Sequence, residues 1–259
     1  MIISGKVALI TGAGSGIGRA TAVALAQKGA ARIWIVDRDD AGARETAALV
    51  AASGAEGIVR IVDVADTAAL TGVFEEAARA GGLDIVFNNA GVLVGRELFP
   101  ETSLARLQAI IAVNITAVVL GTQLAISQMS PRGGGVVINT GSTTAFHSRH
   151  RDYLYAATKA AVVSFSASCA PLFETTGVRV NAVLPGLVNT PILLATGDGQ
   201  LADYMHPILA NNVALAPEDI ARGVIALIED DTRIGEQLVV SAGPASAAAF
   251  DQSRIRVFG

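Results

Sequence analysis

The sequence predicts an α/β protein with a single domain, in which a doubly wound parallel sheet of about seven strands carries helices on both faces. Short apolar runs alternate with longer helical patterns along the chain, and a glycine-rich turn follows the first of these runs. Such alternation produces parallel strands joined by right-handed crossovers. The 259 residues suffice for one domain with a large core.

The expected elements follow one another in a regular order. The first strand is expected over residues 6–11, where Val7–Ile10 is uninterrupted and apolar, and a helix over 17–28 follows the glycines. Further strands are expected at 32–37, 57–62, 84–88, 134–140, 178–184 and 237–241, and further helices at 40–53, 67–80, 102–129, 153–175 and 217–229. No repeat, linker or low-complexity tail interrupts this order, so residues 1–259 are predicted to form one domain.

Charge and hydropathy exclude some classes of function. The net charge is −4 with a pI near 5.4, so the chain has no basic footprint for nucleic acid. Only 16 % of residues are charged and the mean hydropathy is +0.50, which raises the question of a membrane. The most apolar long stretch, Ile110–Ile126, contains Asn114, Thr116, Thr122 and Gln123. A buried or oligomer-facing helix explains it better than a bilayer span, and no membrane association is expected.

The remaining composition favours a cytoplasmic protein. Met1–Lys6 leads almost at once into the first strand, and no signal peptide is expected there. Cys169 is the one cysteine, so no intramolecular disulfide is expected, and a small buried hydrophobe is its expected role. His147, His150 and His206 form no metal-ligand pattern with cysteines or carboxylates, so no metal is expected.

A glycine-rich turn links the first strand to the first helix. It reads Thr11-Gly12-Ala13-Gly14-Ser15-Gly16-Ile17-Gly18. Glycines permit positive φ and let the backbone approach a pyrophosphate, while the helix N-terminus offers free N–H groups and a positive dipole end. The pattern is T-G-x-x-x-G-x-G, because Ile17 stands where the general dinucleotide fingerprint has glycine. For the glycines alone, a purely structural turn is the alternative.

A carboxylate follows the second apolar run. Ile33–Val36 ends at Asp37, nineteen residues after Gly18, and a carboxylate at this position hydrogen-bonds the ribose diol of a dinucleotide. The same charge repels the 2′-phosphate of NADP, so Asp37 predicts NAD. Arg38 offers a partner for that phosphate, but an arginine beside a cofactor often packs flat on the adenine. We therefore give Asp37 the greater weight.

A phenol, an ammonium group and a hydroxyl form the candidate catalytic group. Tyr155 and Lys159 lie four residues apart, and Ser142 lies thirteen residues before the tyrosine. Four residues are just over one helical turn, so phenol and ammonium share a face. A phenol with a pKa near ~10 is a poor base at neutrality, and an adjacent cation is expected to lower that pKa. By itself the pair is weak evidence for catalysis, because an aromatic side chain packed on the core beside a solvated lysine has the same spacing.

Taken together, these motifs identify the chain as a member of the short-chain dehydrogenase/reductase family, in its common subfamily of roughly 250-residue chains. The resemblance covers essentially the whole chain, in order, and implies a Rossmann-type fold. Asp63-Val64 matches the pair that contacts adenine, Asn88-Asn89-Ala90-Gly91 the N-N-A-G motif, and Pro185-Gly186 with Thr190 the segment that holds the nicotinamide. The implied cofactor-binding residues are Gly12, Ser15, Gly16, Ile17, Gly18, Asp37, Asp63, Val64, Asn89, Ala90, Gly91, Tyr155, Lys159, Pro185, Gly186, Val188 and Thr190.

The resemblance implies a catalytic tetrad of Asn114, Ser142, Tyr155 and Lys159. Tyr155 is then the general acid/base, and Ser142 stabilises charge on the substrate oxygen. Lys159 lowers the pKa of Tyr155 and hydrogen-bonds the nicotinamide ribose, and Asn114 holds a water that links Lys159 to solvent. The expected reaction is NAD-dependent interconversion of a secondary alcohol and its ketone. Tyr153, a competing phenol, lies on a different helix face from Lys159.

Three departures from the family pattern concern the shape of the substrate. Tyr155-Ala156-Ala157-Thr158-Lys159 stands for the usual Y-x-A-S-K, and Ala145 stands where glycine often follows the serine segment. His147–Asp152 is more charged than the small-residue stretch expected there. None of these departures removes a catalytic group.

A lid over the substrate is expected at about residues 190–214. This segment holds many apolar residues, and ordinary core packing is an equal alternative. It lies in a stretch without Lys or Arg, between Asn181 and Ala221, so an anionic substrate finds no clamp there. Arg96, Arg149 and Arg151 are other sources of positive charge, and His147 is a weaker candidate for substrate contact. A neutral, fairly apolar secondary alcohol or ketone is favoured.

Two other functions remain open. A reductase of 3-oxoacyl thioesters uses the same tetrad but usually prefers NADPH, so Asp37 counts against it. A non-enzymatic dinucleotide sensor on the same fold tends to lose the tyrosine or the lysine, and here all four catalytic groups are present. The family commonly forms tetramers through the two long helices at 102–129 and 153–175. A homotetramer or homodimer is therefore expected, although burial within one subunit would produce the same apolar pattern.

Overall fold

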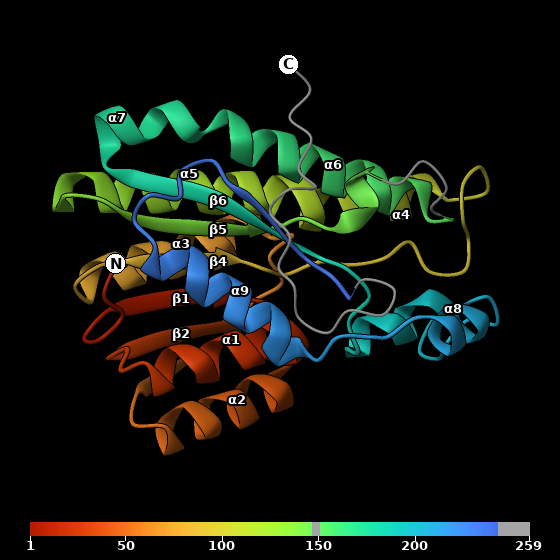
Figure 1. The fold of residues 1–259 in the computed structure, drawn as a ribbon, viewed down its shortest axis with the longest axis horizontal. Coiled ribbons are helices and arrows are strands. Elements are labelled where there is room, and N and C mark those ends of the chain that lie inside the picture. Colours follow the sequence, from red (N-terminus) through yellow and green to blue (C-terminus); the bar gives the residue numbers. More distant parts are fainter. Residues whose placement is uncertain (147–150, 243–259) are drawn as a thin grey trace.

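The computed structural model describes residues 1–146 and 151–242. In this part of the chain a single sheet has seven parallel strands in the order β3-β2-β1-β4-β5-β6-β7 (Figure 1). The strands are β1 (Val7–Thr11), β2 (Arg32–Asp37), β3 (Glu56–Ile61), β4 (Ile85–Asn88), β5 (Gly135–Thr140), β6 (Val178–Pro185) and β7 (Gln237–Val240). Each strand lies within one residue of its expected range, and the predicted fold class is confirmed.

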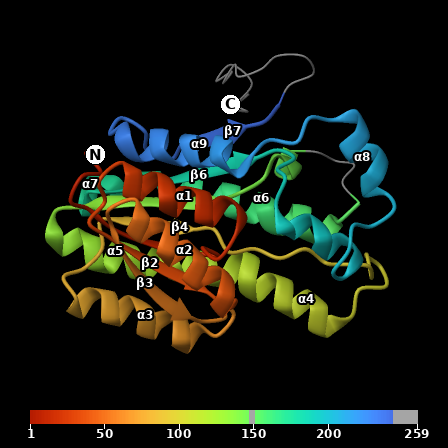
Figure 2. The ribbon, with the colours of Figure 1, turned by 90° about the horizontal axis from the view of Figure 1, so that it is seen from below.

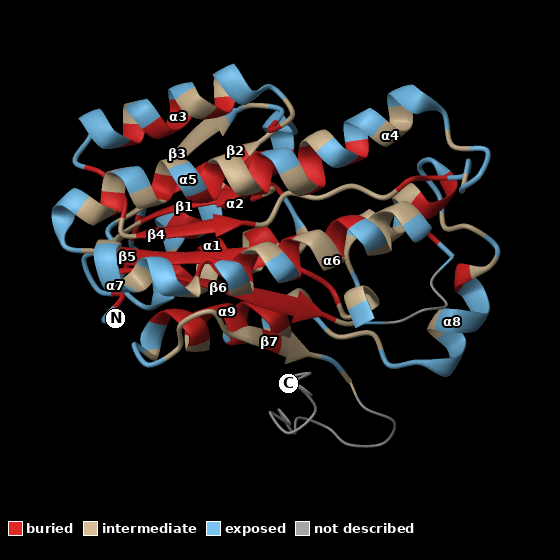
Figure 3. Cartoon of the chain, turned by 90° about the horizontal axis from the view of Figure 1, so that it is seen from above, coloured by how far each residue is buried: buried red, intermediate tan, exposed pale blue. Residues whose placement is uncertain are grey.

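The central strands are buried on both faces. Strand β1 pairs with β2 on one side and β4 on the other, which places Ile10 opposite Ile35 and Phe87. All three side chains are fully buried. Parallel strands covered on both faces appear in a sequence as continuous apolar runs, which is why the pattern located them so closely. The edge strand β3 is the exception, with every residue at least partly exposed (Figure 3).

Helices cover the two faces of the sheet in separate layers. Leu25, Val50 and Val224 join one apolar cluster from α1, α2 and α9, and Phe74 and Ala125 join the opposite cluster from α3 and α5. The helices are α1 (Gly16–Gln27), α2 (Asp40–Ala52), α3 (Thr67–Arg79), α4 (Leu104–Ile111), α5 (Ala117–Met129), α6 (Tyr153–Ser168), α7 (Phe173–Thr176), α8 (Met205–Asn211) and α9 (Pro217–Glu229). In Figure 2, α8 and the starts of α4 and α6 lie at the same end of the molecule.

Both long predicted helices differ from the expectation. The run expected at 102–129 begins at Leu104, because the Ser103 hydroxyl caps it, and a π turn at Ala112–Thr116 separates α4 from α5. The run expected at 153–175 is divided after Ser168, where Pro171 has no N–H for a regular helix. A short 3₁₀ turn follows there before α7. Helix α8 was not expected, because its sequence was assigned to the lid.

Two of the described helical runs are long and apolar enough to cross a membrane. These are Leu104–Arg132 and Tyr153–Thr176, with mean hydropathies of 2.0 and 1.2. Both lie along the sheet, and they are partly buried there (Figure 3). The core helix of a globular domain meets the same criterion of length and composition, so these runs are weak support for a membrane span.

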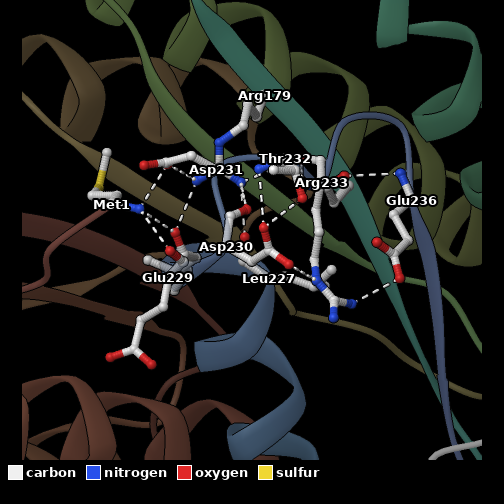
Figure 4. A network of polar contacts seen from close by, with 11 residues as sticks. Met1, Arg179, Leu227, Glu229, Asp230, Asp231, Thr232, Arg233 and Glu236 are labelled. Carbon is white, nitrogen blue, oxygen red and sulfur yellow. Dashed lines mark hydrogen bonds and ion pairs between the residues drawn. The ribbon is translucent and has the colours of Figure 1, made fainter.

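A buried arginine fastens the end of α9 to the sheet. Arg179 on β6 is 3 % exposed, and its guanidinium donates to the carbonyls of Leu227 and Ile228 at 2.8 Å each (Figure 4). It also donates to a carboxylate oxygen of Asp231 at 3.1 Å. These carbonyls have no partner within the helix, so a cation at this end is favourable. The amino group of Met1 adds a second donor to Ile228 at 3.0 Å.

Candidate active site

The predicted site residues gather at the carboxyl ends of the strands. Thr11 ends β1, Asp37 ends β2, and Asn88 ends β4, while Pro185 ends β6. Ser142 follows β5 by two residues. Parallel strands end on the same edge of a sheet, and ligands of doubly wound folds bind there. The structure therefore brings together motifs that lie far apart in the sequence.

The glycine turn packs directly against the N-N-A-G segment. Gly12 and Gly16 have φ values of +64° and +50°, which favour glycine. A Cβ atom on Gly12 would lie 2.8 Å from the Ala90 Cα atom, so a side chain has no room. The Asn89 amide donates to the carbonyls of Thr11 and Gly12 at 3.1 Å each. Asn89 therefore fixes the shape of this turn.

The Asp37 carboxylate faces the same turn. One oxygen accepts a hydrogen bond from the Gly14 N–H at 2.7 Å, and the other accepts one from the Asp39 N–H at 3.0 Å. A Cβ atom on Gly14 would lie 2.9 Å from that carboxyl group. Bare backbone, a helix N-terminus and a carboxylate thus lie together, and this set of groups fits the pyrophosphate and ribose of a dinucleotide.

The two residues expected to contact adenine, Asp63 and Val64, differ in burial. Asp63 is exposed, and its carboxylate lies 4.0 Å from the Arg38 guanidinium. Val64 is 5 % exposed and packs in the cluster beneath α3. Arg38 therefore has an acidic neighbour other than Asp37.

The segment after β6 returns to the glycine turn. A Cβ atom on Gly16 would lie 3.1 Å from the Thr190 methyl group, so Thr190 lies beside this turn. Val188 is 6 % exposed and pairs with Leu215 in an isolated parallel bridge. The Gly186 N–H donates to the Val240 carbonyl at 2.9 Å. The two ends of the expected lid are thus joined across its base.

Replacing Gly18 by alanine is expected to weaken NADH binding, with a packing cost of about 1–3 kcal/mol. The added Cβ atom would overlap the Gly12 carbonyl oxygen, and it would lie 2.8 Å from the Asn89 amide nitrogen. NADH titration and thermal melting measure the effect. Gly72→Ala is the matched control, because no atom lies within 4 Å of its added Cβ in α3, and there we expect about 0.5–1 kcal/mol of stabilisation. Unchanged NADH affinity in Gly18→Ala would show that this contact is dispensable.

The Tyr155 phenol lies beside the Ser142 hydroxyl and near the Asp152 carboxylate. Burial raises the pKa of Tyr155 to about 12, the contact with Ser142 acts to lower it, and the Asp152 carboxylate acts to raise it. The expected lowering of this pKa is therefore wrong. Burial disfavours the phenolate more strongly than the neighbouring groups favour it. The phenol consequently carries its proton at neutral pH.

Lys159 is buried beside the phenol. Its ammonium nitrogen lies 5.6 Å from the centre of the Tyr155 ring and donates to the Thr140 carbonyl at 2.8 Å. Lys159 is 2 % exposed, and burial lowers the pKa of its ammonium group to about 8. A Cβ atom on Gly91 would lie 3.4 Å from that nitrogen, so the N-N-A-G segment passes close to it.

Asn114 lies in the π turn between α4 and α5, and its side chain is fully buried. Its oxygen accepts from the Val92 N–H at 2.9 Å, and its nitrogen donates to the Val92 carbonyl at 2.9 Å. The same nitrogen donates to the Thr158 hydroxyl at 3.1 Å. The side chain therefore holds the loop after β4 against α6, and a water at this residue remains a prediction. Thr158, a departure from the family motif, serves as the partner on α6.

Two features were missed by the sequence analysis. Asp152, assigned only to a charged stretch, is 4 % exposed and caps α6 through the Tyr155 N–H at 2.8 Å. A buried polar chain also joins β4 and β5, because the Asn88 amide donates to Asn139 at 2.9 Å and Asn139 donates to Ser166 at 3.0 Å. An acidic residue just before a helical pattern is a capping signal, and it marked Asp152 in the sequence.

The expected lid contains a 3₁₀ segment, Pro191–Gly197, and helix α8. Of its large apolar side chains only Met205 is buried, while Leu194 is 48 % and Ile208 is 38 % exposed. Most of the large apolar side chains of this segment are therefore half-buried or exposed, and a lid remains a prediction. The predictions for His147, Arg149 and His150 lie outside the described residues.

Comparison with known proteins identifies the family. Residues 6–200 match the family model of the short chain dehydrogenases. The chain is 34 % identical over 244 residues to the 2,5-dichloro-2,5-cyclohexadiene-1,4-diol dehydrogenase of Sphingobium indicum, covering 93 % of this chain and 96 % of that one. The chain belongs to the short-chain dehydrogenase/reductase family and is an oxidoreductase of that family.

Two further relatives bear on cofactor and substrate. The 15-hydroxyprostaglandin dehydrogenase [NAD(+)] of Bos taurus is 38 % identical over 250 residues, covering 91 % of this chain and 90 % of that one. The crystal structure of the 3-ketoacyl-(acyl-carrier-protein) reductase from Brucella melitensis complexed with NADH has a TM-score of 0.82 and 30 % identity, covering 93 % of this chain and 98 % of that one. The family thus includes both dehydrogenases and reductases.

Proposed function

We propose that the protein is an NAD(H)-dependent oxidoreductase that interconverts a secondary alcohol and its ketone, with Tyr155 as general acid/base. The observation that carries this proposal is that the Tyr155 phenol lies beside the Ser142 hydroxyl, which acts to lower its pKa, with the Lys159 ammonium nitrogen 5.6 Å from the centre of the phenol ring. A proton donor, a hydroxyl and a cation are thus close enough together to act on one substrate oxygen.

Each side chain has a separate part in the proposed reaction. In ketone reduction the Tyr155 phenol gives its proton to the carbonyl oxygen, and in alcohol oxidation its phenolate takes that proton back. Ser142 donates to the same oxygen and stabilises its developing charge. Lys159 carries the charge that favours the phenolate, and Asn114 with a bound water completes the path for protons. The nicotinamide supplies the hydride chemistry when it is bound.

The choice of NAD rests on Asp37. Its carboxylate accepts from the Gly14 N–H at 2.7 Å, so it faces the turn where the ribose of the cofactor would lie. A 2′-phosphate placed there meets like charge. The bovine relative is named as an NAD(+) enzyme, which agrees with this choice. The proposed cofactor contacts are the residues carried over from the family, from Gly12 to Thr190.

A neutral and fairly apolar substrate is favoured. The Arg96 guanidinium donates to the Gly197 carbonyl at 3.2 Å, and that of Arg151 lies 5.3 Å from the centre of the Tyr204 ring. These two cations are therefore engaged with the proposed lid, residues 190–214, rather than directed at a ligand. The second candidate is a 3-oxoacyl thioester reductase. The crystal structure of the Brucella reductase is a complex with NADH, so Asp37 does not separate the two candidates.

We also propose a cytoplasmic homotetramer or homodimer, with no nucleic-acid or membrane partner. An apolar groove between α4 and α6 supports self-association, because Ile111 in it is 41 % exposed. Leu107, Ile110, Ile115 and Leu154 line the same groove. The proposal also includes that residues 1–259 form a single domain.

A substrate and cofactor panel tests the function. Cyclic, aliphatic, steroid and polyol secondary alcohols are assayed with NAD⁺ and NADP⁺, and their ketones and a 3-oxoacyl thioester with NADH and NADPH. We expect turnover of a secondary alcohol with a clear preference for NAD(H), and Asp37→Ala should reduce that preference. Equal affinity of the wild-type protein for NAD(H) and NADP(H) would contradict the role of Asp37. Tight NADH binding with no turnover in the panel would favour a sensor.

A further inference from the structure

Asp152 connects the catalytic helix to the loop that follows β4. One carboxylate oxygen accepts from the Tyr155 N–H at 2.8 Å, and the other accepts from the Val94 N–H at 2.9 Å. The residue is 4 % exposed, so both bonds are shielded from water. Its two oxygens thus join the first turn of α6, which carries the phenol, to a loop 58 residues earlier in the chain.

The loop that Asp152 contacts is itself held at consecutive residues. Asn114 bonds both backbone groups of Val92 at 2.9 Å. The Arg106 guanidinium donates to the carbonyls of Leu93 at 2.8 Å and Val94 at 2.7 Å. The run Val92–Val94 is therefore fixed by side chains from α4, the π turn and the α6 cap. A loop held in this way has a fixed position, and its bond to Asp152 therefore fixes the position of α6.

The same two segments also contact the proposed lid. A Cβ atom on Gly95 would lie close to the Asp198 carboxylate, and Arg96 donates to the Gly197 carbonyl at 3.2 Å. On the helix side, the Arg151 guanidinium lies 5.3 Å from the centre of the Tyr204 ring. Asp152 directly follows Arg151 in the chain, and its partner Val94 directly precedes Gly95. Its hydrogen bonds therefore join the loop and helix segments on which the lid rests.

We propose that Asp152 is a positioning residue that fixes Tyr155 relative to the loop Val92–Val94 and the lid above it. This inference rests on the proposed function of Tyr155. A carboxylate suits the role because it accepts from two N–H groups at once. An amide has one oxygen and would turn its NH₂ group toward the second N–H, while a serine hydroxyl caps the helix but is too short to reach the loop as well.

A small displacement of Tyr155 affects the reaction more than it affects folding. Moving a catalytic group by about 1 Å lowers the rate by about 10²-fold, because the reacting atoms lose their alignment. The Asp152 charge also acts on the phenol, and it raises the pKa of Tyr155. Among the described residues, the Lys159 ammonium nitrogen lies 5.6 Å from the centre of the Tyr155 ring, and the Asp152 charge also acts on the phenol of Tyr204, which Arg151 contacts.

The test compares Asp152→Ser and Asp152→Asn with wild type, using the alcohol and cofactor identified in the panel. Both variants retain a helix cap but leave the buried Val94 N–H without its acceptor, so we expect a modest fall in melting temperature in a protein that still folds. We expect kcat to fall by about 10- to 100-fold, with a smaller change in the KM for NAD⁺. Removing the negative charge lowers the pKa of Tyr155, so the rising limb of kcat/KM for alcohol oxidation should move to lower pH. A purely structural cap would not move this limb.

Asp66→Ser is the matched control. Asp66 caps α3 through the N–H groups of Ala68 and Ala69, at 3.0 and 2.9 Å, and α3 carries none of the four catalytic groups. We expect its kcat and pH profile to match wild type. Folded Asp152 variants with wild-type kcat, or with losses like those of Asp66→Ser and no change of the pH profile, would overturn the proposal. Retained activity in Tyr155→Phe would instead overturn the proposed function itself.

Discussion

Replacing Tyr155 by phenylalanine is expected to lower kcat by about 10²–10⁴-fold in both directions while NADH binding is retained. The substitution removes the hydroxyl that exchanges a proton with the substrate oxygen and leaves the half-buried ring in place. It also removes the group beside the Ser142 hydroxyl. Initial rates with the best alcohol and ketone of the panel, together with an NADH fluorescence titration, measure the two effects separately.

Tyr153→Phe is the matched control for this experiment. Tyr153 is two residues away on the same helix, but its side chain is 57 % exposed, and its ring meets that of Phe99 edge-on with centroids 6.3 Å apart. The hydroxyl of Tyr153 is not needed for this ring contact, so turnover should be retained. Activity that survives in Tyr155→Phe and is lost in Tyr153→Phe would transfer the acid/base role to the neighbouring phenol.

Replacing Lys159 by methionine is expected to abolish turnover and to stabilise the ligand-free protein at neutral pH. The loss of the cation should cost at least about 10²-fold in kcat, because the phenolate then lacks its stabilising charge. The stability gain has a different cause. Burial lowers the pKa of Lys159 from 10.5 to about 8, which corresponds to about 3 kcal/mol of destabilisation while the side chain is charged. Loss of the hydrogen bond to the Thr140 carbonyl offsets about 1 kcal/mol of the gain.

The stability difference has a definite pH dependence. Below about pH 8 the lysine is charged in both the folded and the unfolded state, and the folded state bears the full cost of burying it. Between about pH 8 and 10.5 the unfolded chain binds more protons, so the stability of the wild-type protein rises with pH. The advantage of Lys159→Met should therefore be largest at pH 7, at about 2 kcal/mol, and should be lost between about pH 9 and 10; near pH 10.5 the variant lacks the hydrogen bond to Thr140 and should be slightly less stable than wild type. Urea denaturation of the cofactor-free proteins at several pH values measures it, and a variant less stable than wild type at pH 7 would contradict this account.

Elements that leave a clear local pattern in the sequence were predicted closely. The seven strands lie within one residue of their expected ranges, since a strand buried on both faces leaves a continuous apolar run between turn residues. The glycine turn and Asp37 lie near each other as expected, because parallel strands bring their carboxyl ends to one edge. Helix interruptions were predicted less well. The spacing of apolar residues does not indicate the π turn at Ala112–Thr116, and α8 is too short to show a clear helical pattern.

The sequence by itself determined the class of fold, the family and the identity of the candidate catalytic groups, because these follow from periodicity and from motifs read in order along the chain. Only the tertiary structure decided the state of those groups. Burial of Tyr155 and Lys159 moves their pKa values to about 12 and about 8, and burial is set by elements that meet from distant parts of the chain. The role of Asp152 was decided in the same way, since its bond to Val94 depends on a contact that spans 58 residues. Local patterns encode which groups are present, and long-range packing sets their solvation and alignment.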